Sequence, residues 1–145
     1  MFKNPLNYVT ALIAALLLML GVQTMTATPA SAQVCSEEAY VPWFDQGVKY
    51  GGQTRCSSTA GGAVRLQGVL EWDRTWPNKD RILLTGPWSP WEKAPNLHTW
   101  VGQVSCSDVR FYTGQRGVTL RSIVRFEGTD GSADSARSGG AKLCS

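Results

Sequence analysis

The sequence has few of the residues on which most enzyme and metal sites depend. His98 is the only histidine, no two cysteines have the C-x-x-C spacing of a zinc site, and no serine stands in a G-x-S-x-G elbow. The acidic pair Asp130 and Asp134 lacks the regular spacing and the bidentate glutamate of a calcium loop. We therefore expect no metal, no cofactor and no catalysis. A small secreted hydrolase that combines His98 with an acid and a hydroxyl is the alternative.

Clusters of like charge are absent as well. The 14 Lys and Arg residues and the 11 Asp and Glu residues give a net charge of +3. The basic residues stand singly, without the run or stripe that would follow a nucleic-acid backbone. Nucleic acid is therefore not an expected partner.

No apolar stretch is long enough to span a bilayer. The apolar run at residues 9–22 has fourteen residues, whereas a spanning helix needs about twenty. Lys3 precedes this run and an Ala-Ser-Ala tripeptide ending at Ala32 follows it, so residues 1–32 have the three parts of a secretory signal peptide. We expect cleavage after Ala32, which removes 32 of the 145 residues and leaves one secreted, extracellular domain of 113 residues without membrane contact.

Four cysteines remain after this cleavage, and an even number in a small exported domain predicts two disulfides. Four cysteines allow three pairings. We favour the sequential pairing, Cys35 with Cys56 and Cys106 with Cys144. The nested pairing, Cys35 with Cys144 and Cys56 with Cys106, is the second choice.

Helical periodicity is missing from the expected mature chain, and strand periodicity takes its place. In residues 62–73 and again in residues 118–127, apolar and polar side chains alternate with the period of two that is typical of a half-buried strand. Other short alternating segments bring the total to about seven strands. The fold class predicted is all-β, a small antiparallel sandwich or a partly closed barrel.

These two strands also predict their own register. Each has one apolar residue on its polar side, Val69 and Ile123. If these two lie opposite each other in an antiparallel pair, every neighbouring pair is favourable. The inner pairs would be Leu66 with Phe126 and Trp72 with Leu120, and the outer pairs Arg65 with Glu127 and Glu71 with Arg121.

The remaining segments carry weaker signals. Gly51 and Gly52 predict a turn, and the three prolines of residues 86–96 predict a stiff, extended crossing loop. We expect residues 109–113 to form a strand. Residues 128–141 are small and polar with almost nothing to bury, which favours a flexible loop.

The six tryptophans are the clearest candidates for a binding surface. Trp72 and Trp100 are in phase with apolar strand positions, so we expect them in the core. The other four lie in or beside proline-bearing loops, where an aromatic side chain either covers the core or meets a partner: Trp43, Trp76, Trp88 and Trp91. We expect a binding protein that contacts an extracellular protein through a projecting loop at residues 86–91. A carbohydrate-binding module, with two or three tryptophan faces in one plane, is the alternative.

The tetrapeptide Trp88-Ser89-Pro90-Trp91 resembles the W-x-x-W element of thrombospondin type 1 repeats. Those repeats continue with a cysteine-rich pattern, and here only Cys106 and Cys144 follow Trp91. We therefore assign no family, and the sequence sets neither the partner nor the oligomeric state.

Overall fold

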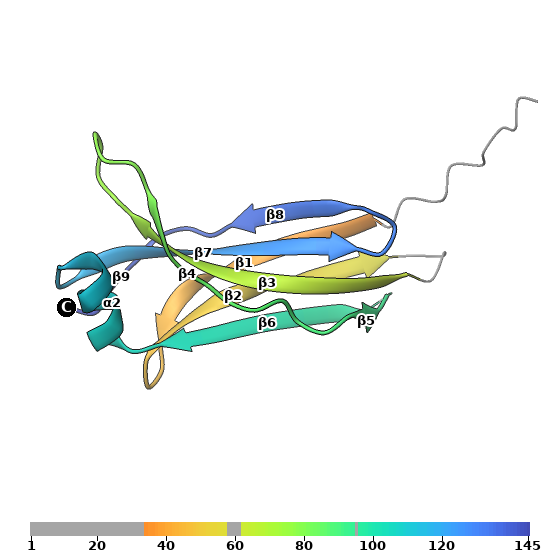
Figure 1. Ribbon diagram of the computed structural model, residues 1–145, viewed down its shortest axis with the longest axis horizontal. Helices are drawn as coiled ribbons and strands as arrows, with labels where there is room; N and C mark the ends of the chain where they lie inside the picture. The colour runs from red at the N-terminus through yellow and green to blue at the C-terminus, as the bar shows by residue number, and fades with distance from the viewer. Residues whose placement is uncertain (1–33, 58–61, 95) are drawn as a thin grey trace, which may run out of the picture.

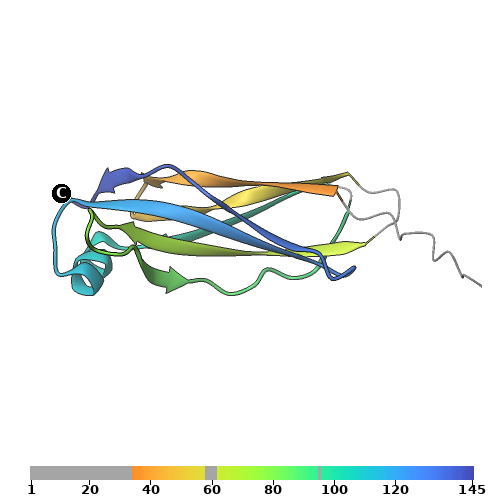
Figure 2. The ribbon, with the colours of Figure 1, turned by 90° about the horizontal axis from the view of Figure 1, so that it is seen from above.

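The computed structural model describes residues 34–57, 62–94 and 96–145 (Figure 1). The predicted signal peptide lies outside these residues. The described chain forms two antiparallel sheets whose strands run along the long axis of the molecule (Figures 1 and 2). The predicted fold class is thus confirmed, as an open sandwich and not a closed barrel.

The first sheet has three strands in the order β1-β2-β6. They are β1 (Val34–Phe44), β2 (Val48–Ser57) and β6 (Leu97–Val104). β1 contains Pro42 and lies at an edge of this sheet, as expected for a residue that cannot donate a ladder hydrogen bond.

The second sheet has six strands, four of which follow the order β4-β3-β7-β8, with β5 paired to β3 and β9 paired to β7. They are β3 (Ala63–Asp73), β4 (Arg81–Thr85), β5 (Glu92–Lys93), β7 (Val118–Gly128), β8 (Ala133–Arg137) and β9 (Ala141–Leu143). β3 and β7 are the longest strands of this sheet and lie at its centre.

The predicted register of β3 and β7 is confirmed. Val69 lies opposite Ile123, and all four predicted neighbouring pairs follow from that alignment. One detail differs from the prediction: Glu71 was expected on the solvent-exposed face of the strand, but it is only 4% exposed. Arg137 of β8 reaches Glu71, with 2.7 Å between Nη2 and Oε2, and this contact keeps the buried carboxylate paired.

The core lies between the sheets in two clusters, and Trp100 packs against both. A Cβ atom on Gly68, Gly86 or Gly102 would overlap the indole ring of Trp100. These glycines therefore form a slot for one large side chain. The prediction that Trp72 and Trp100 belong to the core is confirmed, with Trp72 only 9% exposed.

The turn predicted at Gly51 and Gly52 is not found. Gly51 and Gly52 do not form a turn but lie inside β2, where a Cβ atom would overlap the backbone of Trp100 or of Glu38. Glycine is required there by close approach and not by a change of direction.

Residues 109–113 do not form a strand, since they belong to the helix α2 (Cys106–Thr113). Ser105 caps its first turn by accepting a hydrogen bond from the backbone N–H of Asp108, and Gly114 ends it in the left-handed conformation with φ 69°. The short apolar alternation there is overridden by these caps.

Residues 128–141, for which a flexible loop was expected, contain regular structure. β8 pairs with β7 from Ile123 to Glu127, and β9 pairs with the beginning of β7. Small polar side chains suffice because both strands lie beside β7 and gain their stability from backbone hydrogen bonds. The prediction that the segment at 86–96 is neither helix nor central strand is confirmed for residues 86–94 and 96, apart from the two-residue β5 at the edge of β3.

The sequential disulfide pairing is confirmed, Cys35 with Cys56 and Cys106 with Cys144. In the described ranges, no helix has the length and apolar character needed to cross a membrane.

Candidate functional site

The four candidate tryptophans separate into three places. Trp88 and Trp91 lie beside the first half of β3, Trp76 lies in the hairpin beyond its other end, and Trp43 lies on β1 of the other sheet. The structure therefore brings only one pair together.

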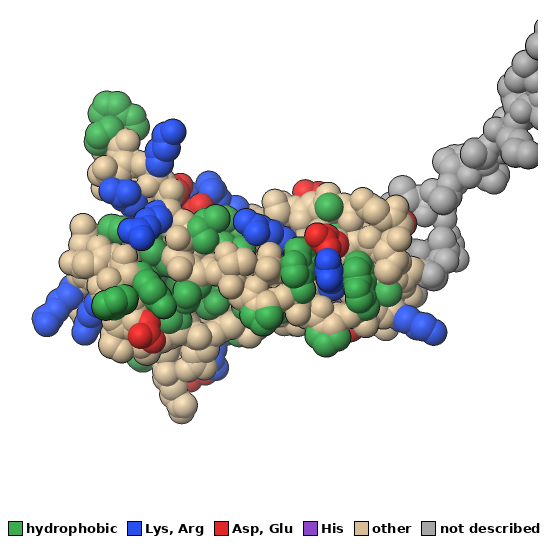
Figure 3. Space-filling model, viewed as in Figure 1, with side chains coloured by type: hydrophobic (Ala, Val, Ile, Leu, Met, Phe, Trp, Pro, Cys, Tyr) green, Lys and Arg blue, Asp and Glu red, His purple; other side chains and the backbone are tan. Residues whose placement is uncertain are grey.

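Trp88 and Trp91 both stack on Arg65. The guanidinium carbon is 4.7 Å from the centroid of each ring, and Arg65 also pairs with Glu127 at 2.6 Å between Nη2 and Oε2. On the face shown in Figure 3, basic atoms lie between two hydrophobic patches near the end that holds β5. One face of each ring is thus occupied by a cation, which gives a packed surface and not an open coplanar platform.

The segment that carries these two rings does not project from the molecule. The backbone N–H of Gly86 donates to Gly68 O at 2.9 Å, and that of Ser89 donates to Leu66 O at 2.7 Å. The segment therefore lies along β3 and covers its edge, which corrects the expectation of a projecting loop at residues 86–91. Pro87 and Pro90 have no backbone N–H, so another strand cannot pair with this segment at those positions.

Trp43 is placed by a bulge in β1. Tyr40 lies opposite Gly51 and Trp43 lies opposite Lys49, so β1 has one residue more than β2 between these pairs. The extra residue brings Trp43 to the same face as Tyr40, with 6.2 Å between ring centroids and 67° between ring planes. Tyr40 continues into a polar chain, because its hydroxyl donates to Gln53 at 2.6 Å.

Trp76 is the most exposed large hydrophobic residue described, at 92%. It lies in the turn between β3 and β4, closed by a hydrogen bond of 3.1 Å from Asn78 N to Thr75 O. We call residues 74–80 the tip hairpin. Figure 1 shows it extending beyond both sheets, and Figure 3 shows hydrophobic atoms at its end.

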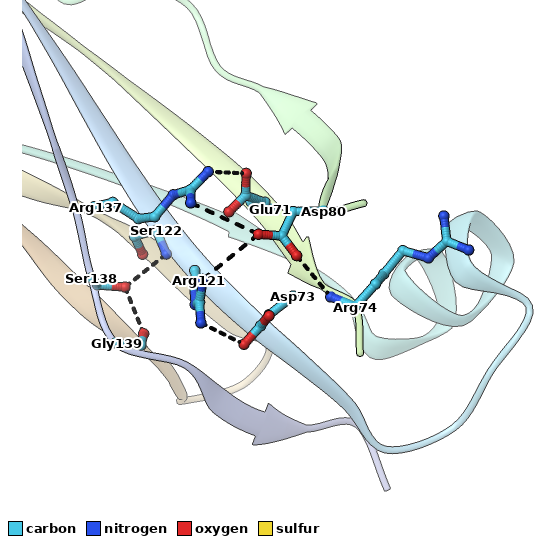
Figure 4. A network of polar contacts seen from close by, with 9 residues as sticks. All are labelled: Glu71, Asp73, Arg74, Asp80, Arg121, Ser122, Arg137, Ser138 and Gly139. Atoms are coloured by element: carbon cyan, nitrogen blue, oxygen red, sulfur yellow. Dashed lines mark hydrogen bonds and ion pairs between the residues drawn. The ribbon is translucent and has the colours of Figure 1, made fainter. Parts of the chain in front are cut away.

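Ion pairs brace the base of the tip hairpin (Figure 4). Arg121 pairs with Asp73 at 2.8 Å and approaches Oδ2 of Asp80 at 3.7 Å, and Arg137 approaches the same oxygen at 3.8 Å. Asp80 also accepts a hydrogen bond of 3.0 Å from the backbone N–H of Arg74. Since the groups that hold Asp73 and Asp80 come from β7 and β8, the hairpin is tied to the body at its root and free at its end.

A recess of about 270 Å³ opens beside this root. We call it the hairpin recess. Its lining is mostly polar and comes from the end of β3, the tip hairpin and the start of β7: Trp72, Asp73, Arg74, Thr75, Asn78, Gln115, Gly117, Val118 and Thr119. Sequence reasoning missed this recess because its two walls are about forty residues apart in the chain and are joined only by the β3–β7 pairing.

His98 lies between the sheets and is 7% exposed. Its Nδ1 contacts the carboxylate of Glu92, and its Nε2 has no hydrogen-bond partner among the described residues. Thr54 lies opposite His98 in the register and is fully buried. An imidazole, an acid and a hydroxyl are thus neighbours, but the hydroxyl is closed to solvent.

A second polar group between the sheets is Glu37, opposite Thr54 on β1. Burial raises the pKa of Glu37 above its ordinary value of 4.5, and the negative charge of Asp134 raises it further. Burial also raises the pKa of Tyr50. In the described part of the chain, no three His, Cys, Asp or Glu side chains form a group that could hold a metal ion.

The fold and its surfaces define a two-sheet, disulfide-bonded all-β domain with one braced, aromatic-tipped hairpin. Comparison of the chain with protein-family models, curated proteins and solved structures finds no match.

Proposed function

We propose that this protein is exported and acts as a non-catalytic binding protein, with the tip hairpin as its contact to an extracellular protein. Disulfides formed by all four cysteines support export, because such bonds persist in oxidising compartments. The signal-like sequence at residues 1–32 supports it independently.

The observation that carries the proposal is the exposure of Trp76 at the end of a braced hairpin. An indole that is 92% exposed gains the most from insertion into a partner's pocket, and tryptophan is enriched among interface hot spots. The ion pairs at the root restrain the hairpin before binding, so that less conformational entropy is lost on association.

The proposal that catalysis is absent is supported by the burial of the only imidazole. His98 and Thr54 are 7% and 0% exposed, so a substrate has no access to them together. The acid–imidazole contact is explained by the need to pair a polar ring inside the sandwich.

Photo-crosslinking tests the proposed contact directly. A benzoylphenylalanine placed at position 76 should form an adduct with one extracellular protein of the producing cells, and the same residue placed at Phe44 should not. Phe44 is a suitable control because it is 61% exposed but lies at the end of β1, in the other sheet.

With the purified partner, calorimetry should show that Trp76→Ala weakens binding by about thirtyfold, the effect of losing a hot spot of about 2 kcal/mol. Trp43→Ala should leave the affinity unchanged. Equal adducts from both positions, or an affinity that does not depend on Trp76, would contradict the proposal.

A carbohydrate is the second candidate, because Tyr40 and Trp43 share one face with a polar chain. The amide of Gln53 joins the Tyr40 hydroxyl to the carboxylate of Glu38 at 2.7 Å. Glycan-array binding that is lost with Trp43→Ala and retained with Trp76→Ala would favour this candidate over the first.

A further inference from the structure

The tip hairpin and the first residue of β4 carry basic side chains without acidic partners. Within the described residues, Arg74, Lys79 and Arg81 form no ion pair, whereas the nearby Asp73 and Asp80 are engaged by arginines of the body. Figure 4 shows the guanidinium of Arg74 pointing away from these carboxylates. The root of the hairpin is therefore neutralised, and its outer surface is cationic.

A further cation stands next in sequence to the opposite wall of the hairpin recess. Arg116 stands between the lining residues Gln115 and Gly117 and also has no ion pair in the described part of the chain. Figure 3 shows basic side chains on the projecting hairpin and on the body below it. Such a surface attracts an acidic partner and accelerates its encounter.

The shape of the recess distinguishes between acidic partners. Hydrogen-bond donors line it, from Thr75 and Asn78 on one wall and Gln115 and Thr119 on the other. A flat bilayer cannot fill a concave volume of about 270 Å³. A loop that carries an Asp or Glu side chain can enter it and accept hydrogen bonds there.

From these observations we infer that the partner is a protein with an acidic loop, whose carboxylate enters the hairpin recess beside Arg74 while Trp76 packs on an adjacent apolar surface. This inference rests on the proposed function and adds the chemical class of the partner. It assigns recognition to the cations and the recess, and leaves Trp76 as the apolar anchor.

A labelled poly-L-glutamate peptide serves as the probe, with fluorescence anisotropy as the measurement. We expect binding at low ionic strength that weakens as salt screens the charges. Arg74→Gln should weaken binding about tenfold, the effect expected for losing one hydrogen bond to a charged group. The triple variant R74Q/K79Q/R81Q should abolish binding.

Two further variants separate specific recognition from general attraction. Arg55→Gln removes an exposed cation from β2 in the other sheet and should have no effect. Gln115→Phe leaves the charge unchanged but fills the recess, and should weaken binding. If Gln115→Phe binds as well as the parent protein, or if Arg55→Gln weakens binding as much as Arg74→Gln, the inference is overturned.

Vesicles of phosphatidylglycerol provide the other arm. Sedimentation of the protein with these vesicles, without binding to poly-L-glutamate, would overturn the inference in favour of an anionic membrane. Binding to neither probe would overturn it as well.

The identified partner then separates this inference from the proposed function. If partner binding depends on Trp76 but not on the three cations, the function stands and the acidic loop is excluded. If the cation variants abolish poly-L-glutamate binding but partner binding does not depend on Trp76, the proposed function fails while the cationic site remains.

Discussion

Trp100 shows how one side chain sets the composition of its neighbours. Its indole lies in the slot formed by Gly68, Gly86 and Gly102, and its Nε1–H donates to the carbonyl oxygen of Pro87 at 3.0 Å. It contacts both core clusters and therefore joins the two halves of the interior. A glycine in the middle of β3 weakens that strand locally, and the indole compensates by filling the space where a side chain would lie.

We predict that Gly68→Ala destabilises the fold by about 1–3 kcal/mol, because the added methyl group overlaps the Trp100 ring in a packed interior. Urea unfolding measures the change. Gly139→Ala is the matched control, since its methyl group would meet only Val41, at 3.9 Å, and the effect should stay within about 0.5 kcal/mol. Equal stability of the two variants would show that the slot is not tightly filled.

Glu37 provides a second test at the scale of one residue. Its raised pKa means that folding favours the protonated carboxyl, owing first to burial and then to Asp134. The stability it contributes is therefore fully present below the unfolded-state pKa, near 4.5, and is lost as the pH rises through the higher folded-state pKa.

Accordingly, Glu37→Gln should raise the urea midpoint at pH 7, because the amide cannot ionise, and this advantage should disappear below the unfolded-state pKa. Glu38→Gln removes the same charge from an exposed position on the same strand and serves as the control. A midpoint at pH 7 that is unchanged or lower for Glu37→Gln would contradict the assigned cause of the shift.

At the scale of secondary structure elements, predictability from sequence follows the strength of the local pattern. β3 and β7 were predictable to the register, because eleven-residue strands with one wet face allow few alignments and charge pairs such as Arg65 with Glu127 select among them. α2 was not predicted, although Ser105 and Gly114 stand at the positions of its caps. Eight residues are too few for a helical period to outweigh a short alternation.

The strands β8 and β9 could not have been found in the same way. Their side chains are small or polar, and their pairing depends on the backbone of β7, which the sequence pattern does not reveal. The candidate site, too, could be predicted from the sequence only in part. Tryptophans in proline-bearing segments were visible in the sequence, but which of them projects depends on the backbone hydrogen bonds that hold residues 86–89 to β3 and leave Trp76 free.

At the scale of the whole molecule, the two disulfides have different tasks. Cys35 and Cys56 are register partners on adjacent strands of the three-stranded sheet, so their bond adds to a ladder that already aligns them. Cys106 begins α2, which follows the three-stranded sheet, and Cys144 follows β9 of the six-stranded sheet. The second bond therefore holds the two layers together at the end that carries α2 and the C-terminus (Figure 2).

This difference predicts different results when each bond is removed by paired Cys→Ser changes. The sequence separations, 21 and 38 residues, give similar entropic losses of about 3–4 kcal/mol for both bonds. Loss of the Cys106–Cys144 bond should also release α2 and β9. The disulfide holds the end of the chain beside α2, where Arg110 donates a hydrogen bond of 2.9 Å to Ser145 O, and without the disulfide this contact should open. Hydrogen exchange should then accelerate in residues 106–113 and 141–145 well below the global transition, whereas loss of the Cys35–Cys56 bond should lower stability without a local opening there. If neither variant showed faster exchange in residues 106–113 and 141–145 than elsewhere, the core alone would hold the two layers together. The wall of the hairpin recess formed by Gly117 and Val118 would then not depend on the Cys106–Cys144 bond, although Gly117 N donates to Cys144 O.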